Sequence, residues 1–411
     1  MNLRKVFKEK DILVVFKNLI SLSLLQLINL ILPFITLPYI ARVVGVENFG
    51  ILAFSSAIIV FFLTVVDYGF NYTAVRDGAR VKEDKIAFSK ILSTVFYSKI
   101  ILFLISFLIF SLLVFFVPLF QKNALILYLS FFSVFSTVFY QEWLFQALEK
   151  MHLLAFLSLI SKVLYTIAIF LLIKKSEDFY LVPVINAISI LITGMISLYL
   201  IVSKLNLKFV VIPIVELITY LKSGFNMFIS LFIPNLYTNI SFIWLSQFHG
   251  KFATGIFDAG YKINGISQTL SSVLSRAFFP LLSRKINFHN FYIKLNLALA
   301  LVSSSILFLF SDIIVSIMFG EGYEQASEVI KIMSISPIFI SLMNIYGTNF
   351  LVLKNKESIL MKIIIFCSLV GALVTAIFIY FWGYVGAAYS ITLVWAIRGF
   401  LTMFFAKKMG A

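Results

Sequence analysis

Long apolar runs recur along this chain from Leu19 to Phe405, and only short polar breaks separate them. A helix of about 20 apolar residues spans the hydrocarbon core of a bilayer, whereas a barrel strand needs only about ten alternating residues. The runs here are too long for barrel strands. With 61% hydrophobic and 12% charged residues, the chain also lacks the polar side chains that a water-facing surface requires. The sequence therefore predicts an all-α integral membrane protein.

The number of runs predicts about twelve transmembrane helices of roughly 20 residues each, joined by short connectors. The expected spans cover about residues 13–39, 48–69, 91–117, 123–147, 153–173, 180–202, 224–247, 256–283, 294–318, 328–353, 359–381 and 384–406.

A repeated pattern divides the chain into two halves. Gly45-Val-Glu-Asn-Phe-Gly50-Ile51 and Gly250-Lys-Phe-Ala-Thr-Gly255-Ile256 share the pattern Gly-x4-Gly-Ile, half a chain apart. An even number of spans between them gives both copies the same orientation, as in transporters whose halves are related by an axis along the membrane normal. We therefore expect two six-helix lobes related by such a pseudo-two-fold axis. The expected lobes are residues 1–203 and 224–411, and residues 204–223 form an amphipathic linker on the cytoplasmic surface.

The basic residues indicate the orientation. Twenty-one lysines and arginines fall in the termini and connectors of one side, and five fall in the connectors of the other. Cytoplasmic loops carry the excess of positive charge, so both termini are expected in the cytoplasm. The net charge of +15 is then mainly a topology signal, and no compact basic domain is present to bind nucleic acid. The lone Cys367 and three scattered histidines predict neither an intrachain disulfide nor a metal site.

Seven cations fall inside the expected spans, although each costs about 2.5–3.5 kcal/mol at the bilayer centre. They are Lys99, Lys162, Lys262, Arg276, Lys331, Lys362 and Arg398. Lys331 and Lys362 lie close enough to a span end to reach the interface. Lys162, Arg276 and Arg398 lie deeper, so they need a water-filled cavity, a counter-ion or an anionic ligand. Carboxylates deep in the membrane are scarce, which favours an anion as the ligand.

Polar stripes on three expected spans have two interpretations. Asp258, Lys262 and Arg276 share one face of the eighth span, because Asp258 and Arg276 are five helical turns apart. In the first interpretation, the polar faces line a cavity, and Gln26 and Asn29 of the first span and Asn226 of the seventh also face it. The second is helix packing through small residues and interhelical hydrogen bonds, with an Asp258–Lys262 pair. The sequence leaves both open.

Seven segments resemble one family of membrane proteins. They are Leu37-Pro-Tyr-Ile-Ala-Arg42-Val-Val-Gly45, Phe49-Gly50, Asp67-Tyr-Gly69-Phe-Asn71, Ala74-Val-Arg76-Asp77, Tyr140-Gln-Glu-Trp-Leu-Phe-Gln-Ala-Leu-Glu-Lys-Met151, Phe319-Gly-Glu-Gly-Tyr323 and Gly383-Tyr-Val-Gly386-Ala-Ala. Together they look like bacterial flippases of O-antigen and polysaccharide repeat units, the Wzx type. The Trp-Leu-Phe-Gln segment is the most specific of them, and Ala147 departs from the glycine that the family often has.

The resemblance implies the fold of the multidrug/oligosaccharidyl-lipid/polysaccharide exporters, with two six-helix lobes around a central cavity in the bacterial cytoplasmic (inner) membrane. It implies a transporter and not an enzyme. Its substrate would be a polyprenyl-pyrophosphate-linked oligosaccharide, moved from the cytoplasmic to the periplasmic leaflet. No cofactor is expected, although a proton or sodium gradient is a candidate driving force. Membrane lipids and other polysaccharide-assembly proteins are the expected partners.

Residue roles follow from combining the buried cations with this substrate. Lys162, Arg276 and Arg398 are expected to contact the pyrophosphate, with Lys99 and Lys262 assisting. The amides of Gln26, Asn29 and Asn226 would bind sugars. Three further residues, expected in loops, are assigned to gating: Arg42, Asp77 and Arg80.

Two other functions remain open. A cation-coupled drug or metabolite exporter would have the same lobes, but the scarcity of deep carboxylates argues against it. A membrane polysaccharide polymerase would be expected to carry a long outer loop or acidic catalytic residues at the membrane edge, and neither is found in the sequence.

Overall fold

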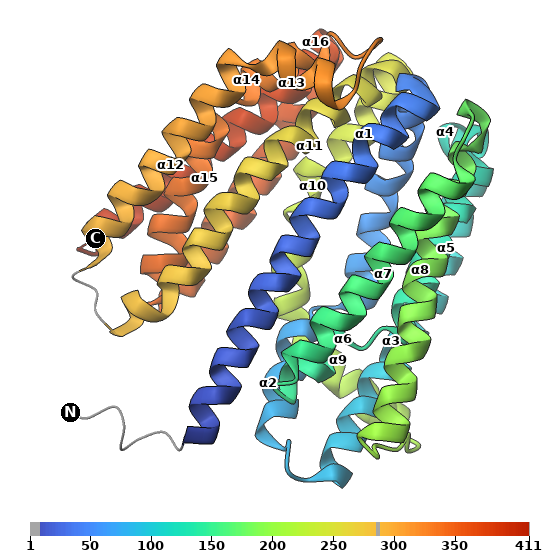
Figure 1. Ribbon diagram of the computed structural model, residues 1–411, viewed down its shortest axis with the longest axis vertical. Helices are drawn as coiled ribbons and strands as arrows, with labels where there is room; N and C mark the ends of the chain where they lie inside the picture. Colours follow the sequence, from blue (N-terminus) through green and yellow to red (C-terminus); the bar gives the residue numbers. More distant parts are fainter. Residues whose placement is uncertain (1–8, 285–287, 411) are drawn as a thin grey trace. The chain divides into compact units, whose positions relative to one another are not determined.

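The chain is almost entirely helical in the computed structural model, which describes residues 9–284 and 288–410 (Figure 1). Side chains are described for residues 32, 34–276, 278, 279, 282 and 288–410. Within those ranges there is no β-strand, and nine helical stretches are long and apolar enough to cross a membrane. The prediction of an all-α, multi-pass membrane protein is confirmed.

Short helical segments lie between the long helices along the chain. Up to residue 232 they are α1 (Glu9–Asp67), α2 (Phe70–Arg80), α3 (Lys85–Phe116), α4 (Pro118–Lys122), α5 (Ala124–Phe139), α6 (Glu142–Ala147), α7 (Met151–Leu172), η2 (Ser176–Tyr180), α8 (Leu181–Tyr199), η3 (Leu200–Lys204) and α9 (Ile214–Phe232). The rest are α10 (Asn235–Thr238), α11 (Ile240–Arg284), α12 (His289–Leu309), α13 (Ser311–Met318), α14 (Ala326–Met333), α15 (Ser336–Leu342), η5 (Met343–Val352) and α16 (Glu357–Lys408).

Three of the long helices are broken at a glycine. Gly45 in α1, Gly250 in α11 and Gly383 in α16 have non-helical backbone angles with positive φ. Each lies where the sequence predicts a connector between two spans, so each long helix holds parts of two expected spans. These breaks agree with the expected spans at three places, and the complete twelve-helix layout stays a prediction.

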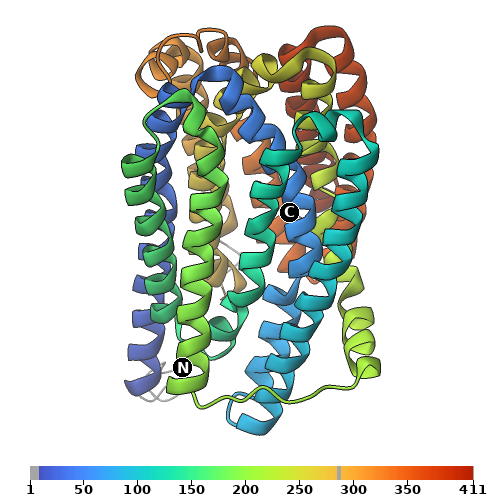
Figure 2. The same cartoon turned by 90° about the vertical axis from the view of Figure 1, so that its right-hand side faces the viewer.

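The chain forms two compact units. Of the described residues, unit 1 comprises 9–36, 61–174 and 180–229, and unit 2 comprises 37–60, 175–179, 230–284 and 288–410. The division near residue 230 lies close to the expected start of the second lobe, whereas residues 37–60 and 175–179 pack with unit 2. In unit 1, α5 packs along α8, and in unit 2, α11 packs along α16 (Figure 2).

The Trp-Leu-Phe-Gln segment forms part of the core of unit 1. Trp143 of α6 is fully buried, stacks on Phe88 with ring centroids 6.0 Å apart, and donates to Gln141 Oε1 at 2.8 Å. A Cβ on Gly78 of α2 would lie 3.2 Å from the Trp143 ring. The most specific stretch of the family resemblance therefore packs α2 against α6.

The expected linker helix continues directly into the expected seventh span. α9 begins at Ile214 and runs without a break to Phe232. Its second half packs on unit 1, because Tyr68 stacks on Phe228 with ring centroids 4.7 Å apart and Gly224 faces the Tyr68 ring. The helix is therefore an integral part of unit 1.

The two copies of the repeated pattern cross each other within unit 2. Gly45 and Gly250 have closely similar angles, with φ of 76° and 80° and ψ of 165° and −176°. Five residues beyond each, Gly50 and Gly255 allow the helices to touch, since Gly50 lies against the carbonyl of Lys251. The repeat predicted from the sequence is therefore matched in its local structure.

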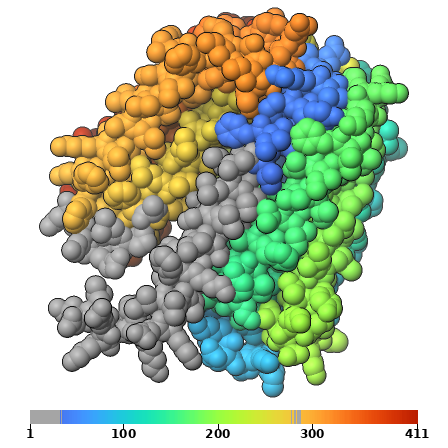
Figure 3. All heavy atoms as spheres, in the orientation of Figure 1, coloured from blue at the N-terminus to red at the C-terminus, as the bar shows by residue number. Residues whose placement is uncertain are grey.

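A buried polar network holds together three helical segments of unit 2, α11, α12 and η5. In η5, a π-helix, Asn344 donates to Ser271 Oγ at 2.9 Å, and Asn349 donates to Ser275 Oγ at 2.8 Å. Asn349 also donates to the Tyr292 hydroxyl at 2.7 Å, and Asn296 of α12 donates to the same oxygen at 2.8 Å. The second half of α12, which lies in the orange part of the surface in Figure 3, exposes the apolar side chains of Leu301, Val302, Ile306, Phe308 and Leu309.

Candidate functional site

The cations inside the helices divide into those with a carboxylate partner and those without one. Lys99 of α3 is buried and donates to Asp67 Oδ1 at 2.9 Å. Asp67 ends α1 and is 41% exposed, so it can keep part of its hydration while it neutralises the lysine. The expected substrate contact at Lys99 is thus already engaged by a neighbour from unit 1.

Lys262 of α11 is also paired. Its ammonium donates to the buried Asp258 four residues earlier, and it lies 4.5 Å from the centroid of the Phe49 ring. The Asp258–Lys262 pair is the one expected in the packing interpretation of this helix. Lys262 nevertheless remains 41% exposed, so a donor can still reach a ligand. Lys331 is likewise paired, with Asp312 at 2.8 Å.

Lys162, Arg276 and Arg398 have no carboxylate partner among the residues whose side chains are described. Arg276 is exposed on α11, whereas Lys162 on α7 and Arg398 on α16 are partly buried. The Nε atom of Arg398 is buried and has no hydrogen-bond partner within the described part of the chain. The three cations that the sequence singles out are therefore free of the pairing that occupies Lys99, Lys262 and Lys331.

These three cations lie well inside their helices. Lys162 is 11 residues from the start of α7, Arg276 is eight residues from the end of α11, and Arg398 is ten residues from the end of α16. At 1.5 Å per residue, these separations correspond to roughly 12–17 Å along each helix.

The amides expected to bind sugars are only partly visible. Asn226 is exposed on α9 of unit 1. The side chains of Gln26 and Asn29 lie outside the described residues, although their backbone belongs to α1.

The expectation that Arg42, Asp77 and Arg80 lie in loops is wrong. α1 continues through Arg42 as far as the break at Gly45, and Asp77 and Arg80 belong to α2. Arg42 donates to the carbonyls of Ser316 and Ile317 in the last turn of α13. A guanidinium at this place satisfies carbonyls that the helix leaves unpaired and complements the negative end of its dipole.

The segment that follows α13 packs on the same part of α1. Phe319 and Tyr323 lie edge-on to the Phe49 ring at 6.2 and 5.9 Å, and the Tyr323 hydroxyl donates to the carbonyl of Ala41 at 3.1 Å. Burial raises the pKa of the Tyr323 hydroxyl, so it stays a neutral donor. Phe319-Gly-Glu-Gly-Tyr323 therefore packs against the first copy of the repeat.

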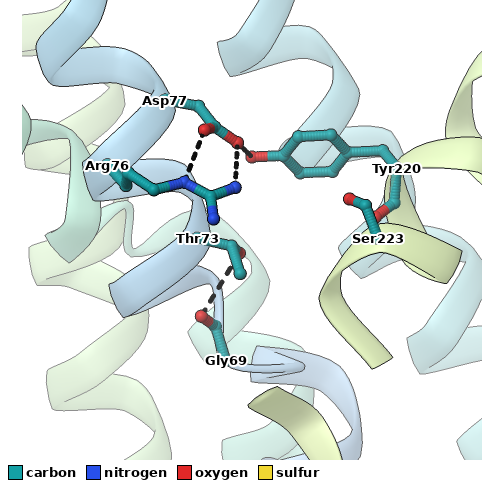
Figure 4. Close-up of polar contacts among 6 residues, drawn as sticks. All are labelled: Gly69, Thr73, Arg76, Asp77, Tyr220 and Ser223. Carbon is teal, nitrogen blue, oxygen red and sulfur yellow. Dashed lines mark hydrogen bonds and ion pairs between the residues drawn. The ribbon is translucent and has the colours of Figure 1, made fainter. Parts of the chain in front are cut away.

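Asp77 joins α2 to α9 through a small polar cluster (Figure 4). It accepts from Arg76 Nε at 2.8 Å and Nη2 at 3.2 Å, and from the Tyr220 hydroxyl at 3.4 Å. The Tyr220 ring stacks on Phe70 with ring centroids 6.2 Å apart. Sequence reasoning missed Tyr220, although an aromatic residue on an amphipathic helix was a usable signal. Arg80 is exposed at the end of α2.

Similar proteins support the predicted resemblance. A family model described as "Polysaccharide biosynthesis protein" matches residues 15–286, which is more than half of the chain. A relative in Escherichia coli (strain K12), named "Putative O-antigen transporter", is 29% identical over 365 residues, covering 87% of this chain and 88% of the relative.

Solved structures share the fold. One is titled lipid II flippase MurJ in an inward closed conformation, with a TM-score of 0.73 and 16% identity over 95% of this chain and 87% of that chain. Another is an inward-facing multidrug resistance transporter of the MATE family in the MOP superfamily, with a TM-score of 0.71 and 13% identity over 95% of this chain and 98% of that chain.

These names agree with the expectation of a membrane transport protein and not an enzyme. The family match extends from α1 to the end of α11, and it includes the first repeat, α6 with Trp143, and the second repeat. The predicted resemblance is confirmed, and the chain belongs to the polysaccharide biosynthesis protein family.

Proposed function

We propose that this protein is a flippase for a polyprenyl-pyrophosphate-linked oligosaccharide, such as an O-antigen or related repeat unit. It would carry the headgroup from the cytoplasmic to the periplasmic leaflet of the bacterial inner membrane while the prenyl tail stays in lipid. Membership of the polysaccharide biosynthesis family supports the substrate class, as does the name of the E. coli relative.

The observation that carries the proposal is the set of three cations inside expected spans that have no carboxylate partner among the side chains that the structure describes. An unpaired charge inside a bilayer is costly, and it persists where a water-filled path or a ligand compensates it. A pyrophosphate supplies the missing negative charge. Two of the three are arginines, whose planar forks bind phosphate oxygens with two parallel hydrogen bonds. Lys162, Arg276 and Arg398 are accordingly the proposed phosphate contacts.

Their positions along the helices support this role. With both termini in the cytoplasm, as the charge asymmetry predicts, each of the three lies about 12–17 Å from the cytoplasmic end of its helix. In each unit, these cations would therefore lie within reach of a headgroup that enters from the cytoplasmic leaflet.

The remaining predicted contacts have secondary roles in the proposal. Lys262 keeps an exposed ammonium beside the Phe49 ring, where it can add a hydrogen bond to the headgroup. Lys99 contributes through the field of its pair with Asp67. The amides of Gln26, Asn29 and Asn226 would bind sugar hydroxyls.

Translocation would follow the alternating access expected of repeat-built transporters, with a proton or sodium gradient as the proposed driving force. The contacts of Arg42 with α13 and of Asp77 with α9 are the proposed points where this motion is controlled, with Arg80 beside the second.

A complementation experiment tests the proposal. Arg276→Gln and Arg398→Gln, expressed in a deletion strain, should abolish surface glycan while membrane levels stay normal. Arg276→Lys should restore part of the activity, because it returns the charge without the fork. Lys362→Gln is the matched control, since Lys362 is an exposed in-span cation near the start of α16. Full glycan in both glutamine variants would overturn the proposal. A changed drug susceptibility with intact glycan would favour the drug-exporter alternative.

Accessibility gives a second measurement. The chain has one cysteine, Cys367, so a Cys367→Ala background allows single cysteines at positions 162, 276 and 398. A membrane-impermeant thiol reagent should label all three through the aqueous path, and a lipid-linked substrate should slow the labelling. Absence of labelling at every position would place the side chains in lipid and contradict the proposed phosphate contacts.

A further inference from the structure

A pocket of about 490 Å³ lies within unit 1, between the first turns of α3 and the amphipathic part of α9. Ala87, Ile91 and Thr94 line it from α3, and Val215, Thr219 and Ser223 line it from α9. None of the substrate contacts proposed above lines it. The pocket is therefore a separate candidate site.

An exposed ion pair lies at this pocket. Lys90 Nζ and Glu216 Oε2 are 2.7 Å apart, and their side chains are 54% and 44% exposed. Exposed ion pairs of this kind contribute little to stability, so a ligand can replace the mutual contact at small cost. The site thus offers one positive and one negative group side by side.

The hydroxyl groups of the pocket present acceptors. Thr94 donates to the carbonyl of Lys90 and Thr219 donates to the carbonyl of Val215, both at 2.8 Å, and Ser223 donates to the carbonyl of Tyr220 at 2.7 Å. Since each hydroxyl proton is committed to its own helix, the remaining lone pairs can only accept. A ligand that carries several N–H donors would match them.

Apolar side chains around the pocket are strongly exposed. Ile86 is 84% exposed, Val215 69%, Ile214 56% and Ile218 46%. Apolar side chains of an amphipathic helix that are exposed in this way are typical of a helix lying in the interface of a bilayer. The surroundings of the pocket therefore suit the acyl chains of a membrane lipid.

We infer that the pocket binds one phospholipid whose headgroup carries a phosphate and a primary amine, as in phosphatidylethanolamine. The phosphate contacts Lys90, and the three N–H groups of the ammonium donate to Glu216 and to two of the lining hydroxyl oxygens, that of Thr219 among them. The acyl chains pack on Ile91 and Val215. A trimethylated headgroup has no N–H to donate, and a glycerol headgroup has no positive charge for Glu216.

The inference is tested by lipid titration of the full-length protein, delipidated in detergent and followed by native mass spectrometry. The three probes are phosphatidylethanolamine, phosphatidylcholine and phosphatidylglycerol with identical acyl chains. The wild type should bind the ethanolamine lipid most tightly. Glu216→Gln should reduce its preference over phosphatidylglycerol by about tenfold, which corresponds to the loss of one charged contact. Lys90→Gln should weaken both of these lipids.

The control is another exposed pair of unit 1. Lys82 and Glu149 are 3.2 Å apart and 38% and 57% exposed, and neither lines the pocket. Lys82→Gln should leave all three affinities unchanged. Thr219→Val retains the charges and the shape of the side chain, and it should lower the preference for ethanolamine over choline. Equal binding of the three lipids by the wild type, or variants that behave like Lys82→Gln, would overturn the inference.

Discussion

Gly50 and Gly255 occupy equivalent places in the two copies of the repeat, and each lies against the main chain of the other copy. A Cβ on Gly50 would lie 1.9 Å from the carbonyl oxygen of Lys251, and a Cβ on Gly255 would lie 2.1 Å from that of Val46. Val46 and Lys251 each follow the glycine at which their helix breaks. The two copies therefore contact each other in the same way, with the glycine of each copy against a backbone carbonyl of the other.

Gly50→Ala and Gly255→Ala should each destabilise the protein strongly. Neither backbone carbonyl can move aside without separating the two helices, and overpacking of this kind costs about 1–3 kcal/mol or more. Thermal unfolding of the detergent-solubilised protein measures the effect. Gly265→Ala is the control in α11, because nothing lies within 4 Å of its Cβ position. A small and equal effect for all three variants would contradict the close crossing.

Gly45→Ala and Gly250→Ala should cost similar amounts although open space surrounds both positions. Their shared backbone angles belong to a region that is essentially restricted to glycine, with a penalty of about 1–3 kcal/mol for other residues. The same unfolding assay should give matching losses. A clear loss at only one of the two positions would show that the kinks are not equivalent.

Asp67→Asn should destabilise unit 1 more than Lys99→Met does. The asparagine variant removes the carboxylate that the buried Lys99 contacts directly, whereas the methionine variant leaves an Asp67 that is 41% exposed and can be hydrated. Removing one partner of a buried pair costs about 3–5 kcal/mol, and removing both costs less than the sum. A double-mutant cycle on unfolding temperature measures this. Equal single losses that add fully would exclude the coupling.

Arg42→Gln should weaken the attachment of α13 to α1 in unit 2. It removes the charge-assisted donors that satisfy the carbonyls of Ser316 and Ile317, an interaction with a helix end worth about 0.3–1 kcal/mol. Hydrogen exchange at the last turn of α13 should increase. Arg80→Gln is the control, because Arg80 is exposed at the end of α2. An unchanged rate of hydrogen exchange in the Arg42→Gln variant would show that Arg42 does not attach α13 to α1.

The sequence predicts the helical membrane fold and the repeat, and it singles out the three deep cations that have no carboxylate partner among the described side chains. Apolar length and glycine spacing are local signals, and they identify the breaks at Gly45 and Gly250. The sequence does not predict that Lys99 contacts Asp67, because that contact joins two helices and the two residues are 32 positions apart. The capping of α13 by Arg42 is even harder to predict, because donor and acceptor are 275 positions apart in the sequence. Such contacts depend on packing between helices, which a single-helix pattern does not contain.

The π-helix at residues 343–352 has a mechanical consequence. Each residue there bonds five positions back, so the run holds more residues per turn than the α-helix before it. If this run became α-helical, the residues beyond Val352 would rotate about the helix axis and shift along it. Asn344 and Asn349 oppose this, because their amides are hydrogen-bonded to Ser271 and Ser275 of α11. The two amides that hold the π-helix against α11 therefore also resist its rotation.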